Sequence, residues 1–353
     1  MSAVSVRGRA AETFDLPADP VAFSRECTRR GWSDGLPLIP PTAARVTEML
    51  AAVRRDPLEV LGVLSPRQGV ATVEAVAVNA VMAGCEPRQL PVLLAAVQAV
   101  ADPAFNLDGI NATTHPCGVF ILASGPAARA AGIHGGSGCF GPGFPANVTI
   151  GRALRLVLLN VAGASPGVGD RATQATPAKL AFCATERDDA SPWPPFQTTR
   201  GYAAGDSCVT AWACEGPHNI QEHGSNTAEG ILQTIAGAMG QAGSNNILAG
   251  GEPLLCLGPE HAATIAGGGY SRESVQRYLF ENARFPGARL SDEFRESVRG
   301  RMQGGEGERE RDGMLGISDR PEEIHIMVAG GPGKHSCWMP TFGGMTRPVT
   351  VAL

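Results

Sequence analysis

A glycine-rich stretch, HGGSGCFG at 134–141, is the part of this chain best suited to hold a reactive group. Glycines let the backbone approach a ligand closely, and the helix expected over 146–163 offers unpaired N–H groups to a carboxylate or phosphate. A bend of this kind, next to a helix start, also exposes the sulfur of Cys139 and lowers the pKa of its thiol. We therefore predict that Cys139 is a nucleophile.

The segment AGGPGKHSCW at 329–338 offers a second group of chemical side chains. It places Lys334, His335 and Ser336 at the end of an apolar strand, and an amine, an imidazole and a hydroxyl are parts of acid–base and nucleophilic sites. We predict that Lys334 and His335 donate or accept protons. We also predict that the two loops meet, because sites of open α/β sheets gather at strand ends. Substrate contacts are predicted for His134, Gly135, Gly136, Gly138, Gly141, Asn147, Gly331 and Gly333.

The segment GDSCVTAWACEGPHNIQEHG at 205–224 holds further thiol and imidazole groups. Cys208 is a second candidate for catalytic thiol chemistry. If the segment is helical, His218 and Glu222 share a face, and together with His223 they form a zinc or iron site. A glycine and a proline interrupt any helix just before this group. We therefore expect that the protein uses no cofactor, and a divalent metal ion is the alternative.

The composition excludes several classes of function. With 29 Lys and Arg against 34 Asp and Glu and no basic run, the chain offers no cationic face for nucleic acid. Its nine cysteines form no CxxC pair, which favours reduced thiols over a disulfide framework. The start lacks the apolar centre of a signal peptide, and no run reaches the ~18 apolar residues of a membrane span. We therefore expect a cytoplasmic protein with neither nucleic-acid nor membrane partners.

Apolar runs followed by glycine and proline predict the elements that position these groups. The clearest run is GVFILAS at 118–124, which predicts a buried strand, a turn and a helix. Similar segments lie at 253–269 and, more weakly, at 324–336. Helical stretches flank the first two copies, at 72–101, 146–163, 226–243 and 271–284. The pattern predicts an α/β fold in which repeated strand-turn-helix lobes pack as one large unit.

The predicted domains follow from these copies. Residues 1–45 are expected to form an irregular N-terminal arm with a proline-rich segment, 46–200 the first α/β lobe and 201–353 the second. The charged stretch at 291–314 predicts a solvated helix that runs into a mobile loop near 300–314.

Five segments of the chain resemble a known family: WSDGLPLIPPT, ATVEAVAVNAVMAGCEP, GSGCFGPG, TIGRALRLVLLNVAGASPG and SPW. Over residues 30–215 the chain is similar to the long members of the bacterial UGSC-motif (seleno)protein family. The resemblance implies a thiol or selenol enzyme. The tetrad that names the family corresponds to GDSC at 205–208, of which only Ser207 and Cys208 carry over. The resemblance therefore supports an enzyme without identifying its reaction.

Together these features predict a small-molecule enzyme whose cysteine, lysine and histidine side chains lie in glycine-rich loops. Hydrolase or lyase chemistry on a carbonyl-containing or anionic substrate is the first expectation, with loop N–H groups stabilising an oxyanion. Three alternatives stay open: a thiol–disulfide oxidoreductase using Cys139 or Cys208, a metal-dependent enzyme, and a non-catalytic protein that binds a small anion. Assembly of the chain into a homo-oligomer is also left open.

Overall fold

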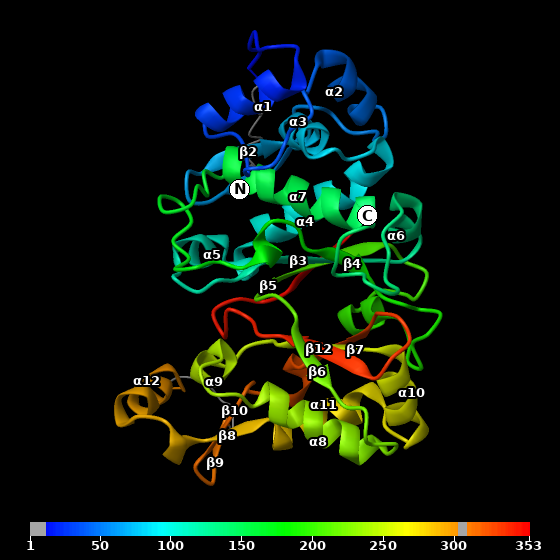
Figure 1. Cartoon of the computed structure of the whole chain (residues 1–353), viewed down its shortest axis with the longest axis vertical. Helices are drawn as coiled ribbons and strands as arrows, with labels where there is room; N and C mark the ends of the chain where they lie inside the picture. The colour runs from blue at the N-terminus through cyan, green and yellow to red at the C-terminus, as the bar shows by residue number, and fades with distance from the viewer. Residues whose placement is uncertain (1–11, 303–308) are drawn as a thin grey trace, which may run out of the picture.

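The computed structural model describes residues 12–302 and 309–353. Two four-stranded sheets are stacked face to face in the middle of the molecule, and helices cover the outer face of each sheet (Figure 1). Three buried clusters correspond to these layers, one between the sheets and one between each sheet and its helices. The chain is a mixed helix-and-sheet fold, which confirms the predicted α/β class.

The first sheet has the strand order β13-β5-β3-β4. Its strands are β3 (Gly118–Ser124), β4 (Cys183–Thr185), β5 (Cys208–Cys214) and β13 (Val349–Ala352). β3 runs parallel to β4 and antiparallel to β5, and β13 is antiparallel to β5. The strand predicted at 118–124 is therefore an inner strand of this sheet.

The second sheet has the strand order β11-β7-β12-β6. Its strands are β6 (His218–Gln221), β7 (Leu254–Leu257), β11 (His325–Val328) and β12 (His335–Met339). β7 runs parallel to β11 and antiparallel to β12, and β6 is antiparallel to β12. Both sheets therefore have the same pattern of strand directions.

The two sheets exchange their edge strands. β6 follows β5 along the chain, yet it pairs with β12 in the second sheet, and β13 follows β12, yet it pairs with β5 in the first. The two crossings meet where the N–H of Glu215 donates to the carbonyl of Pro340 at 2.8 Å. Because β5 and β13 belong to the first sheet, a division of the chain at residue 200 does not follow the sheets.

Six helices form the outer layers. α3 (Val73–Ala83), α4 (Leu90–Ala101) and α7 (Pro145–Asn160) cover the first sheet, and α8 (Ala228–Met239), α10 (Pro259–Gly267) and α11 (Arg272–Asn282) cover the second. Local sequence sets their ends: Thr72 Oγ1 accepts from the N–H of Ala75 to begin α3, which ends at Gly84 with φ 88°. These helices confirm the helical stretches predicted around the first two strand copies.

The remaining elements are shorter or peripheral. The other helices are α1 (Pro20–Arg29), α2 (Ala43–Leu50), α5 (Leu107–Ala112), α6 (Pro126–Ala131), α9 (Asn245–Ala249) and α12 (Asp292–Met302). Short 3-10 helices lie at Pro87–Gln89, Pro103–Phe105, Pro177–Lys179, Phe196–Arg200, Gly287–Arg289 and Pro321–Glu323. Two small antiparallel sheets join β1 (Val60–Leu64) with β2 (Gly69–Thr72), and β10 (Met314–Gly316) with β8 (Arg284–Pro286) and β9 (Glu310–Arg311). Of the helices in the described residues, none alone is long and apolar enough to cross a membrane, although the bent pair Pro87–Ala101 and Pro103–Ala112 meets that test jointly.

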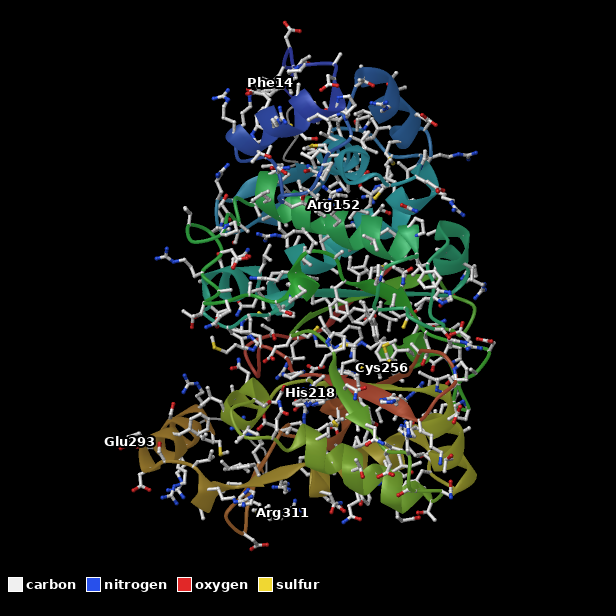
Figure 2. The ribbon with its side chains drawn as sticks, viewed as in Figure 1. Phe14, Arg152, His218, Cys256, Glu293 and Arg311 are labelled. Carbon is white, nitrogen blue, oxygen red and sulfur yellow. The ribbon has the colours of Figure 1, made fainter. Side chains whose placement is uncertain are left out.

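The N-terminal segment is packed where the structure describes it. α1 buries Phe23 and Cys27, so the expectation of an irregular arm is wrong for this helix. Arg152, which Figure 2 labels on α7, binds the carboxylate of Asp34 with an Nε–Oδ2 distance of 2.6 Å. Both partners of this ion pair are buried, so it ties the proline-rich segment to the core. Residues 1–11 of the predicted arm lie outside the described part of the chain.

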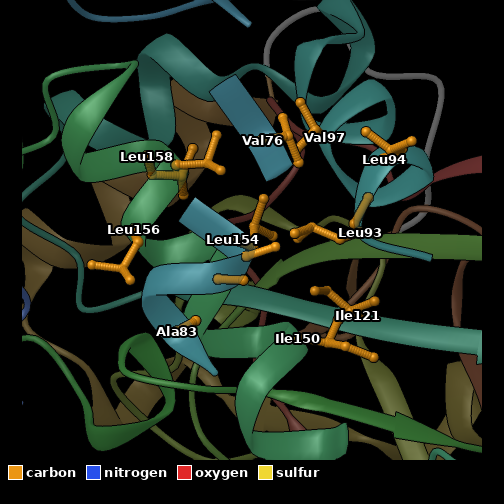
Figure 3. Packing of buried hydrophobic residues seen from close by; sticks show 14 of the residues in the cluster. Val76, Ala83, Leu93, Leu94, Val97, Ile121, Ile150, Leu154, Leu156 and Leu158 are labelled. Atoms are coloured by element: carbon orange, nitrogen blue, oxygen red, sulfur yellow. The ribbon is translucent and has the colours of Figure 1, made fainter. Parts of the chain in front are cut away.

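Strand alternation sends the side chains of β3 into two different cores. Phe120 and Leu122 face the second sheet, whereas Ile121 packs under the helices with Leu93 and Ile150 (Figure 3). Each such side chain stabilises the fold by about 1.5–3 kcal/mol through its removal from water. The first sheet therefore carries apolar side chains on both faces, as a sheet between two layers must.

The third strand-turn-helix copy, expected at 324–336, has a different form. β11 is followed by a turn and by strand β12 rather than by a helix. Gly330 and Gly333 take φ values of +111° and +128°, which only glycine adopts freely, and they turn the chain back into an antiparallel strand. α12 occupies the first part of the predicted charged helix, and residues 303–308 of the predicted mobile loop lie outside the described residues.

Candidate functional site

The two glycine-rich loops meet, as the sequence predicts. The N–H of Gly330 donates to the carbonyl of Gly135 at 2.8 Å. Gly331 lies so close to Ser137 that a Cβ atom at this position would come within 1.8 Å of the serine Oγ. The close approach of the two backbones therefore depends on a glycine at 331.

Asn147 holds the first loop in its bend. Its Oδ1 accepts from the N–H of His134 at 2.8 Å, and its Nδ2 donates to the carbonyls of His134 and Cys139 at 2.8 and 3.0 Å. The His134 ring stacks on Phe144 with 3.7 Å between centroids, and its Nε2 lies 3.3 Å from the carbonyl of Ser137. Asn147 is predicted to contact substrate, but its side-chain amide forms these hydrogen bonds with the loop itself.

Several loop N–H groups predicted to stabilise an oxyanion are already bonded. The N–H of Cys139 donates to the carbonyl of Gly136 at 3.1 Å, and that of Gly141 donates to Gly138 at 2.8 Å. The N–H of Gly333 donates at 2.7 Å to the side-chain carboxylate of a glutamate in α10. These three donors serve the conformation of the loops.

Cys139 does not have the exposed, acidified thiol that the glycine-rich bend predicts. Its side chain turns into the core between the sheets, where the residue is only 4% exposed. Burial raises the pKa of the thiol to about 12. Cys208, the second predicted thiol, is buried within β5, and burial raises its pKa to about 11. The glycines shape the loop but do not present the sulfur to solvent.

Lys334 holds a neighbouring segment. Its Nζ donates to Asn226 Oδ1 at 2.8 Å and to the carbonyls of Ser225 and His223 at 3.2 and 3.3 Å. Three oxygen acceptors satisfy all three protons of an ammonium group. The lysine predicted as a proton donor or acceptor therefore anchors the turn after β6.

Ser336 is buried in a polar contact beneath β12. Its Oγ lies 2.8 Å from His261 Nδ1 and accepts from the N–H of Gly258 at 3.1 Å. His261 Nε2 lies 3.0 Å from the carbonyl of Glu222. Because a carbonyl only accepts, Nε2 carries the proton and Nδ1 accepts from the serine hydroxyl. Burial lowers the pKa of His261, so this neutral tautomer is favoured and fixes β12 against α10.

The residues of the alternative metal site lie on a strand and a turn, so the predicted shared helix face for His218 and Glu222 is wrong. The Glu222 carboxylate accepts from Thr234 Oγ1 and from the N–H groups of Ser225 and Gly224, and these bonds lower its pKa to about 2. Within the described ranges, no group of three or more His, Cys, Asp or Glu side chains is arranged to hold a metal ion.

An imidazole, an amide and a thiol share one face of β12 and β6. His335 Nδ1 lies 3.0 Å from Asn219 Oδ1. Cys337, two residues along β12 on the same face as His335, is the direct register partner of Asn219. His335 and Asn219 are exposed, and Cys337 is partly buried. The His223 ring meets the His335 ring edge-on with 4.9 Å between centroids. The thiol thus lies between solvent-exposed polar groups and the core.

Four thiols gather between the two sheets: Cys139, Cys214, Cys256 and Cys337. Figure 2 shows Cys256 at the level where the sheets face each other. A hydrogen bond with Cys337, together with burial, raises the pKa of Cys256 well above its ordinary value. Of these four residues, only Cys337 is more than marginally exposed.

The sequence contains a signal for part of this arrangement. Alternation along HSCWM places His335 and Cys337 on one face if the segment is a strand. Asn219 was missed, because its position opposite Cys337 depends on the register between two strands more than a hundred residues apart. Nothing in the spacing of a single sequence reveals that register.

No family model matches the chain, and no curated protein or solved structure matches it either. The resemblance to the UGSC-motif family therefore stays an expectation. Function is inferred from the geometry around His335, Cys337 and Asn219.

Proposed function

We propose that this protein is a cysteine-dependent enzyme that acts on the carbonyl group of a small molecule, with Cys337 as nucleophile. His335 is its general base and acid, and Asn219 orients the imidazole. The observation that carries this proposal is the 3.0 Å contact between His335 Nδ1 and Asn219 Oδ1. An amide oxygen only accepts, so Nδ1 carries the proton and Nε2 keeps a lone pair for the proton of a thiol. A cysteine, a histidine and an orienting asparagine form a known set of acyl-transfer groups.

The proposed reaction has two balanced steps. Nε2 of His335 removes the thiol proton of Cys337 as the sulfur bonds to the acyl carbon, and the leaving group departs with that proton. Water then attacks the thioester and gives one proton to the same nitrogen, and the proton returns to the sulfur as the acid product leaves. The class is the predicted hydrolase on a carbonyl-containing substrate, with the nucleophile moved from Cys139 to Cys337.

Access and rigidity support this choice of thiol. Cys337 is partly buried beside exposed polar groups, whereas Cys139 is buried and poorly ionised. Ser336, between the two proposed catalytic residues, is fixed by His261, so the backbone of β12 is held in place. A site on a fixed strand orients its groups better than one on a mobile loop.

The two sheets further support the inference that the chain is an internal repeat. Each sheet has one strand followed by glycine, proline and a helix, a parallel neighbour on one side, and two antiparallel strands on the other. In this repeat, among the described strands, only the second sheet carries the cysteine and histidine pair, both on its inner strand β12. A cytoplasmic location and a homo-oligomer complete the proposal.

Hydrolysis of p-nitrophenyl acetate, an activated ester, tests the proposed function. His335→Gln should reduce release of p-nitrophenolate by about 10² to 10⁴, the usual effect of losing a proton-transfer group. Asn219→Ala should reduce it about tenfold, as expected for a lost hydrogen bond of ~1.4 kcal/mol. Mass spectrometry of the quenched reaction should find the acetyl group on the tryptic peptide 335–353, which contains Cys337.

His218→Gln is the matched control. His218 is an exposed histidine next to Asn219 on β6, and it pairs with Trp338 on the opposite face of the sheet. This variant should hydrolyse the ester at the wild-type rate. Equal rates for His335→Gln and His218→Gln, or an acetyl group on another cysteine, would refute the assignment.

A further inference from the structure

Cys256 and Cys337 are direct partners across two neighbouring antiparallel strands. Cys256 lies on β7 and Cys337 on β12, and the register pairs them with each other. Residues opposite each other in an antiparallel pair have Cα atoms about 4.5 or 5.5 Å apart. Disulfides span Cα distances of about 4.4–6.8 Å, so a bond fits either kind of pair without movement of the strands.

Both sulfurs also point to the same side of the second sheet. The two residues belong to the cluster between the sheets, and their thiols are hydrogen-bonded to each other. Both cysteines are reduced in the structure. The pair is therefore a dithiol already in position for bond formation.

We propose that Cys256 and Cys337 are a modification site at which a hydroperoxide forms a reversible disulfide. The disulfide removes the thiol of Cys337, so the loss of catalysis that we expect from it rests on the proposed function. Formation of the disulfide does not depend on the proposed function. A second thiol placed directly behind an accessible one protects it from irreversible oxidation.

Access sets the order of the steps. Cys337 is partly buried, and Cys256 is 2% exposed, so the peroxide meets Cys337 first. Its thiolate attacks one peroxide oxygen, the O–O bond breaks, and the products are a sulfenic acid and hydroxide. The sulfur of Cys256 then attacks the sulfenic sulfur, and hydroxide leaves with the proton of the Cys256 thiol as water. The hydroxide from the first step takes up the proton that Cys337 lost on ionisation, so hydrogen peroxide is reduced by two electrons to two waters. Two molecules of a small thiol then supply the two electrons that restore the pair.

Cys139 and Cys214 are the competing partners. Both lie in the same cluster, and the neighbouring Cys337 contributes to the raised pKa of each thiol. The backbone of Cys139 belongs to the bend at 134–143, and that of Cys214 to β5 in the first sheet, so neither lies on a strand paired with β12. We therefore expect Cys337 to bond to the partner that the sheet fixes opposite it.

Peptide mapping of the wild-type protein tests the proposal without any substrate. The purified chain is treated with a small excess of hydrogen peroxide, its free thiols are alkylated after denaturation, and it is digested with trypsin and a glutamate-specific protease. Cys256 and Cys337 then lie in the segments 230–260 and 335–353, each with no second cysteine. We expect these two segments joined, in most of the oxidised protein, and separated again after dithiothreitol.

The Cys256→Ser and Cys139→Ser variants separate the two partners. Cys139→Ser should form the same disulfide as the wild type, whereas Cys256→Ser should leave Cys337 as sulfinic acid that dithiothreitol does not reverse. A disulfide between Cys337 and either Cys139 or Cys214, or Cys337 that stays a free thiol while other cysteines oxidise, would overturn the proposal. Ester hydrolysis that fails while the disulfide forms would count against the proposed function alone.

Discussion

Access to solvent separates Cys337 from the other thiols between the sheets. Cys139 is 4% exposed, and burial raises its pKa to about 12, so almost no thiolate forms at neutral pH. Cys337 lies beside exposed polar groups at the boundary of the core. The glycines around Cys139 let the loop bend toward its partner loop, and this bend turns the sulfur inward.

Iodoacetamide at neutral pH should therefore label Cys337 about ten times faster than Cys139 in the native protein, because alkylation needs an accessible thiolate. Trypsin separates the two residues into the peptides 335–353 and 130–152, each with one cysteine, so their labelling rates can be measured side by side. Both should react at similar rates after unfolding in urea. Faster native labelling of Cys139 would make it the better candidate for the nucleophile.

Glu186 is a buried carboxyl group where the two sheets join. Its oxygens accept from the N–H of Val328 at 3.0 Å and of Phe196 at 2.5 Å, and Arg272 Nη2 lies 3.7 Å away. Burial raises its pKa to about 7, although the charge of Arg272 acts in the opposite direction. An acid whose pKa is higher in the folded chain stabilises the fold below about pH 4.5, and this contribution is lost as the pH rises through 7.

The free energy of unfolding should therefore fall between about pH 5 and 8 by about 1–3 kcal/mol more in the wild type than in Glu186→Gln, which cannot ionise. Urea unfolding at a series of pH values measures both slopes. Glu281→Gln, at an exposed position in α11, is the control and should follow the wild type. Parallel curves for wild type and Glu186→Gln would show that Glu186 does not titrate in this range.

At the scale of the elements, the contact between the two loops depends on one close approach. A Cβ at Gly331 would lie 1.8 Å from the Oγ of Ser137 and 2.8 Å from its Cβ, so rotation of the hydroxyl alone does not make room. Gly331→Ala should lower the free energy of unfolding by about 1–3 kcal/mol, as overpacking does. Denaturant titration measures this change.

Ser137→Gly in the same chain should restore most of the loss, because it removes both clashing side-chain atoms. Gly205→Ala is the control, since a Cβ at Gly205 meets nothing within 4 Å. Full stability of Gly331→Ala would mean that the loops move apart easily.

Helices and strands could be predicted from the sequence where their own residues determine them. The run at 118–124 is a strand because it is short, apolar and followed by glycine and proline, and β3 confirms it. The helix predicted in the third copy was wrong, because Gly330 and Gly333 permit a reversal of the chain direction. The apolar run before them does not reveal this reversal. His335 was identified by its chemistry, but its hydrogen bond to Asn219 depends on strand register, which only the assembled sheet fixes.

At the scale of the whole molecule, the exchanged edge strands link the two sheets. β6 completes the second sheet directly after β5, and β13 completes the first directly after β12. Neither sheet can lose its edge strand without pulling on a strand of the other. The shared core between the sheets adds to this connection.

The two sheets should therefore unfold in a single cooperative transition. The chain has four tryptophans, of which Trp212 lies on β5 and Trp338 on β12, both fully buried. Two variants each keep one of these tryptophans and carry phenylalanine at the other three tryptophan positions. In each variant, the urea midpoint measured by fluorescence should equal the midpoint measured by circular dichroism. Separate midpoints would show that the sheets unfold independently.

The same exchange governs the order in which a ribosome can complete the molecule. β5 spans Cys208–Cys214, and the strand that covers its free edge, β13, spans Val349–Ala352. Translation therefore delivers the whole of the second sheet before the first sheet gains its last strand. During that interval β5 presents an unpaired row of backbone donors and acceptors, the kind of edge that joins strands of other chains. A nascent chain that stalls before Val349 therefore exposes the edge of β5, which can pair with strands of other chains and which β13 covers in the complete fold.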